Sequence, residues 1–443
     1  MKIQISEHFT YKKLFRFVLP SVVMMVFTSV YGVVDGLFVS NFVGKTAFAA
    51  INLVMPFIMI LGGMGFMVGT GGVALVLRTL GMGKERDAKR YFTMLVIFAV
   101  GLGAVLTAVG MSFVRPISRL LGATDDMIEH CVLYGRIVMG FTIFFMLQSM
   151  FQSFLAAAEK PGLGLIVTVV AGCTNAVLDA VFIAGFRWGL VGAAVATGIG
   201  QVVGGLVPLI YFMCPNKSLL RFTKTRFEIV PVLKACGNGS SELLTNVASS
   251  IVSMLYNFRL LSFFGENGVS AYGVIMYVQF IFVAIEIGYS VGCAPIISYN
   301  YGAGNTNELK NLFKKSLISM SIAGVLLAAL AFSLAVPLSM LFVGYDKELF
   351  ELTVFAFRIF SFAFVFSGIN IFSSGFFTAL NNGVVSAVLS FSRALVFQVC
   401  FVLLLPALLG PNGIWWAMLA TESLALIVAV CFFIGERKRY NYA

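Results

Sequence analysis

The sequence predicts an all-α membrane protein in which twelve transmembrane helices form two pseudo-symmetric six-helix lobes. Its 443 residues are 60% hydrophobic and only 11% charged, a composition too apolar for a soluble protein of this length. Apolar runs of about 20 residues recur along the chain, each long enough to cross a hydrocarbon layer of roughly 30 Å. The runs are continuous rather than alternating, which excludes a transmembrane β-barrel.

Each of the twelve apolar runs is expected to form one membrane span. The expected spans are roughly 14–40, 50–78, 91–113, 131–156, 162–185, 190–213, 232–263, 270–298, 314–342, 352–380, 384–406 and 412–435. The first run is too long for the apolar core of a signal peptide, and no small-residue cleavage site follows it. We therefore expect the first run to be a membrane span.

An internal repeat predicts the two lobes. A constant shift of half the chain length, here called the repeat shift, aligns four separate blocks, among them "LGMGKERDAK" (Leu80–Lys89) with "YGAGNTNELK" (Tyr301–Lys310). Gly-rich loops and apolar helices also resemble one another by chance, but a constant shift across four blocks favours a duplication. The predicted parts are an N-terminal lobe at 1–213, a cytoplasmic linker at 214–231 and a C-terminal lobe at 232–443. A binding site is expected between the lobes, near the midplane.

The distribution of basic residues predicts the orientation of the chain. Of the 30 Lys and Arg residues, 21 fall at the two termini or in the even-numbered connections, and five fall in the odd-numbered ones. The positive-inside rule therefore places both termini in the cytoplasm. Basic loops that meet anionic lipid also account for the net charge of +11, so membrane lipid is an expected partner and nucleic acid is not.

The sequence contains no motif for metal binding, ATP binding or catalysis. The seven cysteines lie mostly in apolar runs without metal-ligand spacing, and His8 and His130 lie outside the runs. Neither Gly-Lys pair belongs to a phosphate-binding loop. We therefore expect neither an enzyme nor a cofactor, and transport that either uses an ion gradient or is passive.

Polar residues of the N-terminal lobe suggest a cation site. A charge inside the bilayer costs at least about 2.5–3.5 kcal/mol, so Asp35 and Asp179 each need a reason to be there. Asn175 lies one helical turn before Asp179, and an amide with a carboxylate can hold a proton or a sodium ion. Thr197 in the next span adds a hydroxyl. Apart from Na⁺ at the two aspartates we expect no metal, and the alternative is a helix–helix hydrogen bond without a role in coupling.

The repeat predicts that this cation site belongs to one lobe only. The repeat shift pairs Asp179 with Cys400 and Asn175 with Val396. Because the second lobe lacks both polar residues, the symmetry of the fold does not require them.

A second set of polar residues falls in the C-terminal lobe. Glu242, Glu286 and Glu422 lie in predicted spans, as do Arg259 and Arg393. For Glu242 and Glu422 interhelical hydrogen bonding is the favoured interpretation, whereas for Glu286 a functional and a structural role are equally supported. Pairing of the arginines with these acids would be purely structural, and a polar site made of Glu242, Glu286, Arg259 and Arg393 is the functional alternative.

Pro20 lies in the first span, fifteen residues before Asp35. A proline inside a helix removes one backbone hydrogen bond and marks a potential bend. Pro20 is therefore a candidate hinge, with a harmless kink as the alternative.

Three segments carry a family resemblance: "LPSVVMMVFTSVYGVVDGLFVSNFVG", "TNAVLDAVFI" followed by "GLVGAAVATGIGQ", and "GYSVGCAPIISYNYGAGN". They resemble the multidrug and toxic compound extrusion (MATE) family of the MOP superfamily, nearest to its bacterial branch. The resemblance implies two six-helix lobes in a bacterial inner (plasma) membrane and export of amphiphilic, often cationic compounds in exchange for H⁺ or Na⁺. It also implies a cation site at Asp35, Asn175, Asp179 and Thr197, and a bend at Pro20. The C-lobe groups match no general family pattern, which leaves the charge of the substrate open.

The expected function is secondary active efflux by alternating access, carried out by a monomer. A lipid-linked saccharide flippase of the same superfamily is the first alternative, since Arg259 and Arg393 would suit a cationic cavity, although a flippase predicts extra spans. A passive channel is the second alternative, which a repeat with one asymmetric carboxylate site fits less well. The sequence does not define the substrate or the choice between H⁺ and Na⁺.

Overall fold

The computed structural model describes residues 3–43, 45–215 and 218–443, without the side chains of residues 33, 36, 37, 40, 41, 45, 46, 48 and 49. Two of the basic residues used to predict orientation, Lys2 and Lys217, therefore lie outside the described residues. The helices of the first half are α1 Tyr11–Phe42, α2 Lys45–Gly81, α3 Glu85–Leu120, α4 Asp125–Gly140, α5 Thr142–Ala157, α6 Pro161–Asp179, the π segment η1 Ala180–Gly185 and α7 Gly189–Met213.

The second half of the chain follows a non-helical connection that ends at Glu228. Its helices are α8 Ile229–Gly302, α9 Thr306–Val343, α10 Lys347–Ser361, α11 Phe364–Ala379, α12 Gly383–Phe391, the π segment η2 Ser392–Phe397, α13 Gln398–Leu409, the 3₁₀ segment η3 Pro411–Trp416 and α14 Ala417–Tyr440. The exact limits of the two lobes stay a prediction.

These helices account for twelve spans in the part of the chain that the structure describes. Two spans are bent pairs: α4 and α5 meet at 58°, and α10 and α11 meet at 48°. Helix α8 holds two spans, because the chain reverses at Gly265, whose φ of 60° and ψ of −148° suit only glycine. The predicted fold class is confirmed, and the protein is a multi-pass membrane protein.

The geometry repeats at the interval found in the sequence. The residue between α4 and α5 is Phe141, and its counterpart under the repeat shift, Phe362, directly follows α10 at the second bend. Glycines with positive φ pair in the same way, as do prolines inside the long helices: Gly83 with Gly304, Gly189 with Gly410, and Pro116 of α3 with Pro337 of α9. The duplication therefore extends to individual backbone features.

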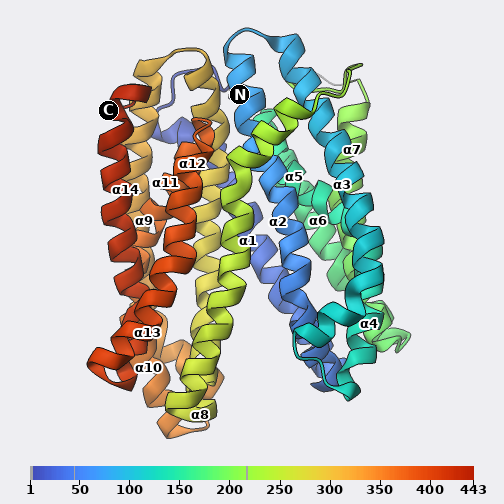
Figure 1. The fold of residues 1–443 in the computed structure, drawn as a ribbon, viewed down its shortest axis with the longest axis vertical. Helices are drawn as coiled ribbons and strands as arrows, with labels where there is room; N and C mark the ends of the chain where they lie inside the picture. Colours follow the sequence, from blue (N-terminus) through green and yellow to red (C-terminus); the bar gives the residue numbers. More distant parts are fainter. Residues whose placement is uncertain (1–2, 44, 216–217) are drawn as a thin grey trace.

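The largest apolar core shared by the two halves lies towards one end of the bundle. Both chain termini lie at that end, which we call the terminal end (Figure 1). There a single apolar core takes residues from both halves, including Phe17, Val76, Ile296 and Phe376. Towards the opposite end the core divides into one cluster from the first half, around Ile51, and one from the second half that includes Tyr256, Phe357 and Trp415.

Paired glycines bring the halves together at the terminal end. A Cβ on Gly81 of α2 would overlap the carbonyl of Tyr299 in α8, and a Cβ on Gly302 of α8 would overlap the carbonyl of Arg78 in α2. The repeat shift relates Gly81 to Gly302, so the same surface is used by both halves, as in a symmetric dimer interface. The close approach of α2 and α8 thus lies on the pseudo-twofold axis.

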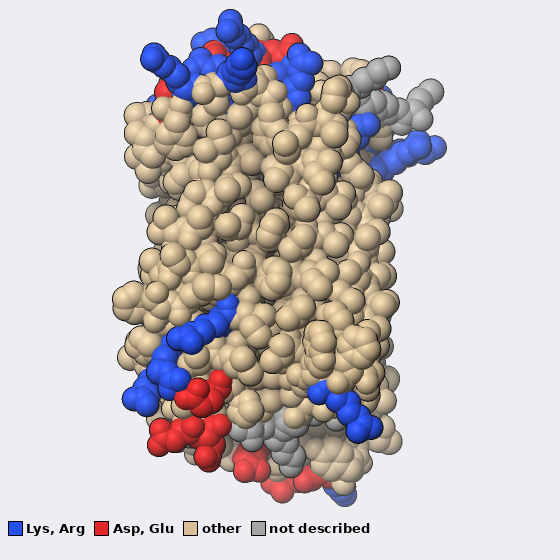
Figure 2. Space-filling view, turned by 90° about the vertical axis from the view of Figure 1, so that its right-hand side faces the viewer, with Lys and Arg blue, Asp and Glu red and all other residues tan. Residues whose placement is uncertain are grey.

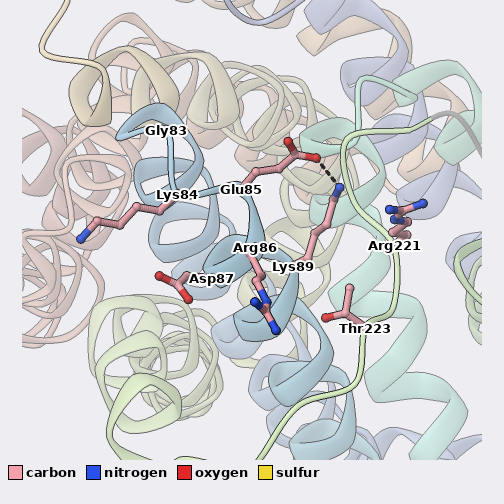
Figure 3. Close-up of a pocket in the computed structure, with 8 residues that line it drawn as sticks. All are labelled: Gly83, Lys84, Glu85, Arg86, Asp87, Lys89, Arg221 and Thr223. Carbon is pink, nitrogen blue, oxygen red and sulfur yellow. Dashed lines mark hydrogen bonds and ion pairs between the residues drawn. The ribbon is translucent and has the colours of Figure 1, made fainter.

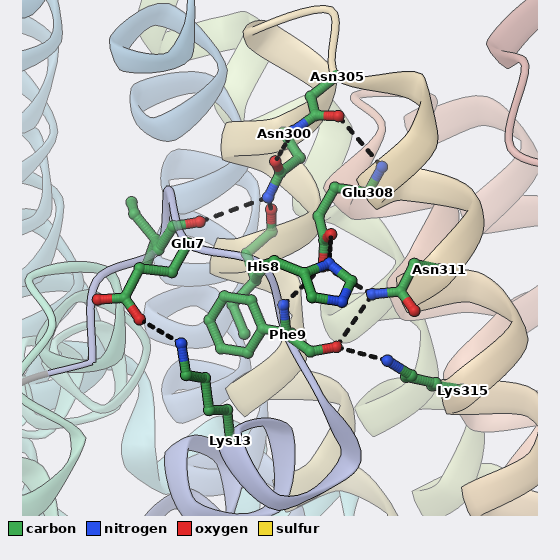
Figure 4. Close-up of polar contacts among 11 residues, drawn as sticks. Glu7, His8, Phe9, Lys13, Asn300, Asn305, Glu308, Asn311 and Lys315 are labelled. Carbon is green, nitrogen blue, oxygen red and sulfur yellow. Dashed lines mark hydrogen bonds and ion pairs between the residues drawn. The ribbon is translucent and has the colours of Figure 1, made fainter.

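Residues 3–10, here called the N-terminal strap, cross this junction (Figure 4). The Ile5 amide donates to the Glu159 carboxylate in the first half at 2.9 Å. The Phe9 amide donates to Glu308 in the second half at 3.0 Å, and His8 Nδ1 lies 2.6 Å from the same carboxylate. Asn311 and Lys315 donate to the Phe9 carbonyl, and Asn300 to the Ile5 carbonyl. The strap therefore holds both halves at once.

The surface carries charge mainly at its two ends. Figure 2 shows a wide belt without Lys, Arg, Asp or Glu on the face in view, with blue side chains predominant at the terminal end and red and blue mixed at the other. Such a belt is what a hydrocarbon layer requires of the surface that it covers.

On the strap, a hydrogen bond from Lys13 keeps the pKa of the Glu7 carboxyl below its usual value.

Candidate functional site

The predicted N-lobe site is assembled from three helices. Asp35 comes from α1, Asn175 and Asp179 from the end of α6, and Thr197 from α7. The Asp35 carboxyl lies within interaction range of the Asp179 carboxyl and the Asn175 amide. Asp179 is fully buried and Asn175 is 4% exposed, whereas Asp35 is half-buried. Asp35 is therefore the more exposed of the two aspartates.

Polar atoms of this site lack partners. Neither carboxylate oxygen of Asp179, nor Oδ1 of Asp35, nor Nδ2 of Asn175 makes a hydrogen bond of normal geometry with any described residue. No basic side chain acts on either aspartate within the described part of the chain. Buried carboxylates without counter-charge are costly, so a bound proton or cation would stabilise the site. Carboxylate, amide and hydroxyl oxygens fit either ion.

Tyr134 is a member of the site that the sequence interpretation missed. Its ring, from α4, is 1% exposed, and its hydroxyl lies beside Thr197 and near both aspartates. Thr197 donates its own proton to the carbonyl of Ala193 at 3.0 Å, so its oxygen is left to accept. A tyrosine inside a predicted span needs a hydrogen-bond partner, and that requirement could have identified Tyr134 as a site residue.

Small residues let α6 and α7 approach each other at this site. A Cβ on Gly200 would stand 3.1 Å from the Cβ of Asn175 and 3.2 Å from the carbonyl of Ala171. The close approach positions the hydroxyl-bearing helix beside the acidic one, as small residues do in membrane helix pairs.

Pro20 lies in an unbroken α1. Just beyond it, α1 packs tightly against α8, since a Cβ on Gly288 would stand 2.6 Å from Cα of Val22. The bend at Pro20 stays a prediction. Pro20 itself lies next to the contact between α1 and α8.

The position that mirrors Asp179 has a different environment. Cys400 is exposed, whereas Val402 is fully buried. The π segment η1 follows Asp179, but η2 precedes Cys400, and a π turn shifts the register of the residues after it. In the second half a buried neutral pair occurs instead: the Tyr256 hydroxyl donates to Oε1 of Gln398 at 3.1 Å.

The C-lobe holds a buried ion pair. Arg393, in η2, donates through Nε to both oxygens of Glu422 at 2.9 and 3.0 Å, and its Nη2 lies 2.8 Å from Oε1. Asn370 of α11 donates to Oε2 of Glu422 at 2.7 Å. Glu422 therefore serves interhelical bonding, in agreement with the favoured interpretation, and Arg393 does pair with an acid.

Glu286 lies beside this pair without belonging to it. Its Oε1 accepts from the Ser367 hydroxyl at 2.7 Å, while the buried Oε2 has no hydrogen-bond partner among the described residues. Arg393 and Glu422 act on it electrostatically. Sequence reasoning missed the polar stripe of α11, in which Ser367 and Asn370 lie one turn apart.

The remaining two C-lobe residues are not brought into this cluster. Glu242 is half-buried and makes no ion pair with a described residue. Its backbone carbonyl accepts from Asn246, whose amide lies 3.2 Å from the Cβ position of Gly63 in α2, so this part of α8 faces the other half. Arg259 stacks on Phe263 with 4.6 Å between the guanidinium carbon and the ring centroid. Arg259 lies near the reversal at Gly265, about 25 Å along α8 from Glu242.

Two surface recesses lie away from these acids. One, of about 460 Å³ at the terminal end, is lined by both signs of charge, and within it Glu85 pairs with Lys89 (Figure 3). Thr223 and Arg221 border it from the connection between the halves, which is fastened by the Thr223 amide donating to Thr93 at 3.1 Å. The other, of about 360 Å³, lies along α10. Within the described ranges no three His, Cys, Asp or Glu residues are placed to hold a metal ion.

Comparison with known proteins identifies a family. A family model described as MatE matches residues 20–181 and 243–404, two segments related by almost the same shift as the sequence repeat. The multidrug export protein MepA of Staphylococcus aureus (strain MSSA476) is 24% identical over 434 residues, which cover 97% of this chain and 94% of that protein.

Solved structures share the fold over almost the whole chain. One, described as the outward-facing conformation of a multidrug resistance MATE family transporter of the MOP superfamily, has a TM-score of 0.91 at 21% identity, covering 97% of this chain and 96% of that one. Another is a MOP superfamily transporter from Pyrococcus furiosus, whose binding pocket is described as reversed in polarity, suggesting a different function. It has a TM-score of 0.88 at 21% identity, covering 97% and 95%.

The family model covers well over half of the chain, and its two matches follow the duplication seen in the backbone. The chain therefore belongs to the MatE family, the multidrug and toxic compound extrusion transporters.

Proposed function

We propose that the protein exports amphiphilic, cationic compounds from a bacterial cell in antiport with H⁺ or Na⁺. The observation that carries the proposal is the Asp35–Asp179 pair, two carboxyls at the same buried site with no basic partner among the described residues. Such a pair binds a cation, and it loses its attraction for a second cation once it is neutralised. The name of MepA, a multidrug export protein, supports the same class of substrate.

The proposed orientation has both termini in the cytoplasm of a bacterium, with the protein in the inner membrane. It is supported by the basic bias of the sequence, 21 residues against five, and by the bacterial relatives. Cysteines introduced at Lys45 and Lys217 should then be labelled from opposite sides. Labelling of both from the same side would contradict the orientation and the two-lobe topology together.

In this orientation the structure is closed to the cytoplasm. The shared apolar core, the glycine contacts and the N-terminal strap all lie at the terminal end. Asp35 lies about 36 Å along α1 from its start, in the half where the apolar cores of the two lobes are separate. The site is thus placed to exchange ions with the outside while the cytoplasmic side is sealed.

Transport follows from the alternation of this closure. A cation that enters from outside neutralises Asp35 and Asp179, and the cationic substrate loses its attraction to the N-lobe and leaves. Repacking or bending of α1 at Pro20 then favours the opposite closure, in which the ion leaves to the cytoplasm and a new substrate binds. The ion can drive this cycle only if it binds the conformation closed to the cytoplasm and the conformation closed to the outside with different affinities.

The alternatives find less support. A passive channel needs a continuous path, whereas the apolar core closes the terminal end. A flippase for anionic lipid-linked saccharides needs a cationic cavity, whereas Arg393 is neutralised by Glu422 and Arg259 stacks on an aromatic ring. We propose a monomer, with membrane lipid as the only other partner and no nucleic acid.

Efflux of a cationic dye from proteoliposomes, with pH and sodium gradients imposed separately, tests the proposal. One of the two gradients is expected to drive the dye against its concentration difference, with saturable rates. Flux that is indifferent to both gradients and does not saturate would favour a channel instead.

A further inference from the structure

We propose that the C-lobe contains a second proton-exchange site, Glu286, whose protonation depends on which of two carboxylates Arg393 binds. The inference starts from the contacts of Glu286, Arg393 and Glu422, and it concerns residues outside the N-lobe cation site.

Charge balance leaves Glu286 without a partner. In the described structure, the Arg393 guanidinium makes all its hydrogen bonds and ion contacts with Glu422. Oε2 of Glu422 also accepts a hydrogen bond from the Asn370 amide. The pair is therefore neutral by itself. Glu286 is 1% exposed, receives only the neutral hydroxyl of Ser367, and has a buried Oε2 without a hydrogen bond. An ionised Glu286 would be an uncompensated buried charge, so in this conformation the acid carries a proton.

The ligand at this site is a proton rather than a divalent metal ion. Cations such as Ca²⁺ and Mg²⁺ take about six or more oxygen ligands in proteins. Among the described residues Glu286 has one hydroxyl partner, and the neighbouring carboxylate is already occupied by Arg393. The groups that face Glu286 are Ser367 of α11, Arg393 of η2 and Glu422 of α14, and within the described residues no other charged group acts on it.

The arrangement has two states of equal net charge. In the observed state Arg393 binds Glu422 and the proton is on Glu286. In the other state Arg393 binds Glu286, and the proton is on Glu422. If the proton leaves altogether, one guanidinium is shared between two carboxylates and the cluster carries one negative charge. The Arg393 side chain is 16% exposed, and η2 is a π segment, a local irregularity that often occurs at functional sites.

The backbone connects this cluster to the moving parts of the protein. Gly288 lies two residues after Glu286 on α8 and packs against the backbone of α1 at Ser21 and Val22, next to Pro20. A shift of α8 that accompanies a change of partner for Arg393 is therefore transmitted to α1. Release of the proton is coupled to the opening of the cytoplasmic side, and the proton passes to water there.

Infrared spectroscopy of the purified full-length protein tests the protonation directly. A buried protonated carboxyl has a carbonyl stretching band distinct from that of a carboxylate. The band of the parent protein should lose one component in Glu286→Gln. It should lose the same component in Glu422→Gln, because Arg393 is then free to pair with Glu286 and ionise it. The matched control Glu351→Gln, at an exposed side chain on α10, should leave the band unchanged.

An identical band in the parent and in Glu286→Gln would overturn the proposal. If Glu286→Gln does not fold, Ser367→Ala decides instead: it removes the hydroxyl that donates to Glu286, so the frequency of the component should shift. An unshifted band in Ser367→Ala would equally overturn it.

The number of protons exchanged per substrate tests the role in transport, and this part rests on the proposed antiport. With tetraphenylphosphonium as the probe, flux in proteoliposomes stops at a membrane potential that depends on the ratio of protons to substrate. That ratio should fall by one in Glu286→Gln, and an unchanged ratio would overturn the transport role. If the parent protein shows no ion-driven flux of the probe, the proposed function fails, and the infrared result still decides whether Glu286 holds a proton.

Discussion

The two lobes have the same backbone plan but different buried polar sites. The N-lobe site has two acids and no base, with Asp179 at the end of α6. The C-lobe site has two acids and one base, and the repeat shift relates its Arg393 to Gly172, which lies about 10 Å along the helix from Asp179. The same shift relates Glu286 to Gly65 and Glu422 to Gln201.

The difference shows that the two lobes share their helices and helix contacts but not their charged residues. The N-lobe acids have no basic partner among the described residues. Glu422 has its counter-charge within the lobe, so the C-lobe needs at most one proton. A change in charge should therefore affect stability mainly in the C-lobe and ion dependence mainly in the N-lobe.

The largest expected effect on stability is that of Arg393→Gln. It leaves Glu422 buried without a counter-charge, which costs about 3–5 kcal/mol when one partner of a buried pair is removed. Thermal unfolding in detergent should show the loss, and the double variant Arg393→Gln with Glu422→Gln should recover most of it. Equal stability of the single and double variants would contradict the ion-pair argument.

Asp179→Asn should have the largest effect on transport. The amide removes the fully buried acid of the pair, so ion-driven efflux should fall to the level of empty liposomes, with little loss of folded protein. Cys400→Ser, at the exposed position that the repeat shift assigns to Asp179, should be nearly silent. Similar losses in both variants would refute a cation site confined to one lobe.

Asp35→Asn should separate substrate binding from ion coupling. The variant is permanently neutral and still folds, because an amide costs less to bury than a charge. Binding of tetraphenylphosphonium should weaken about tenfold, equivalent to about 1.4 kcal/mol, and should no longer vary with pH or sodium. Affinity measured against each ion, at a fixed level of the other, gives the answer. A variant that keeps the ion dependence of the parent would make Asp35 structural.

Pro20→Ala tests whether transport requires α1 to bend at Pro20. It restores one backbone hydrogen bond, which favours a straight α1. Turnover should slow several-fold while substrate binding survives, as stopped-flow efflux and equilibrium binding would show. Unchanged turnover would reduce Pro20 to a tolerated proline.

The smallest effect is expected at the neutral pair of the C-lobe. Gln398→Met removes the acceptor of the Tyr256 hydroxyl and should cost about 1 kcal/mol of stability. Its ion dependence should match that of the parent in the dye-efflux assay. A lost response to pH or sodium would place a coupling group in this region after all.

The fold could be predicted from the sequence because membrane helices are local. The apolar runs predicted all twelve spans, with edges up to about eight residues from the helix ends, and the repeat shift recurs at the two bends, Phe141 and Phe362. That Asp35 and Asp179 belong to one site was implied by the family resemblance, because the two residues lie on different helices and no spacing in the sequence relates them.

Other parts of the sites depend on how each helix is rotated about its axis and on how far its side chains extend, which the sequence pattern does not show. The repeat shift placed Cys400 opposite Asp179, but π segments on different sides of the two positions changed the register. Of the two arginines, Arg393 alone makes an ion pair among the described residues, whereas Arg259 lies far along its helix from Glu242. Tyr134 joins the site from α4, where the sequence pattern does not show which way its hydroxyl points.

The N-terminal strap has a consequence for how the protein is made. Phe9 and its partner Glu308 are 299 residues apart, and Ile5 and Glu159 are 154 residues apart. At about 5–20 residues per second, Glu308 is synthesised about 15–60 s after Phe9. The strap must therefore wait, bound at most to Glu159, until α9 has been inserted. It is fastened to both lobes only after α9 has been made.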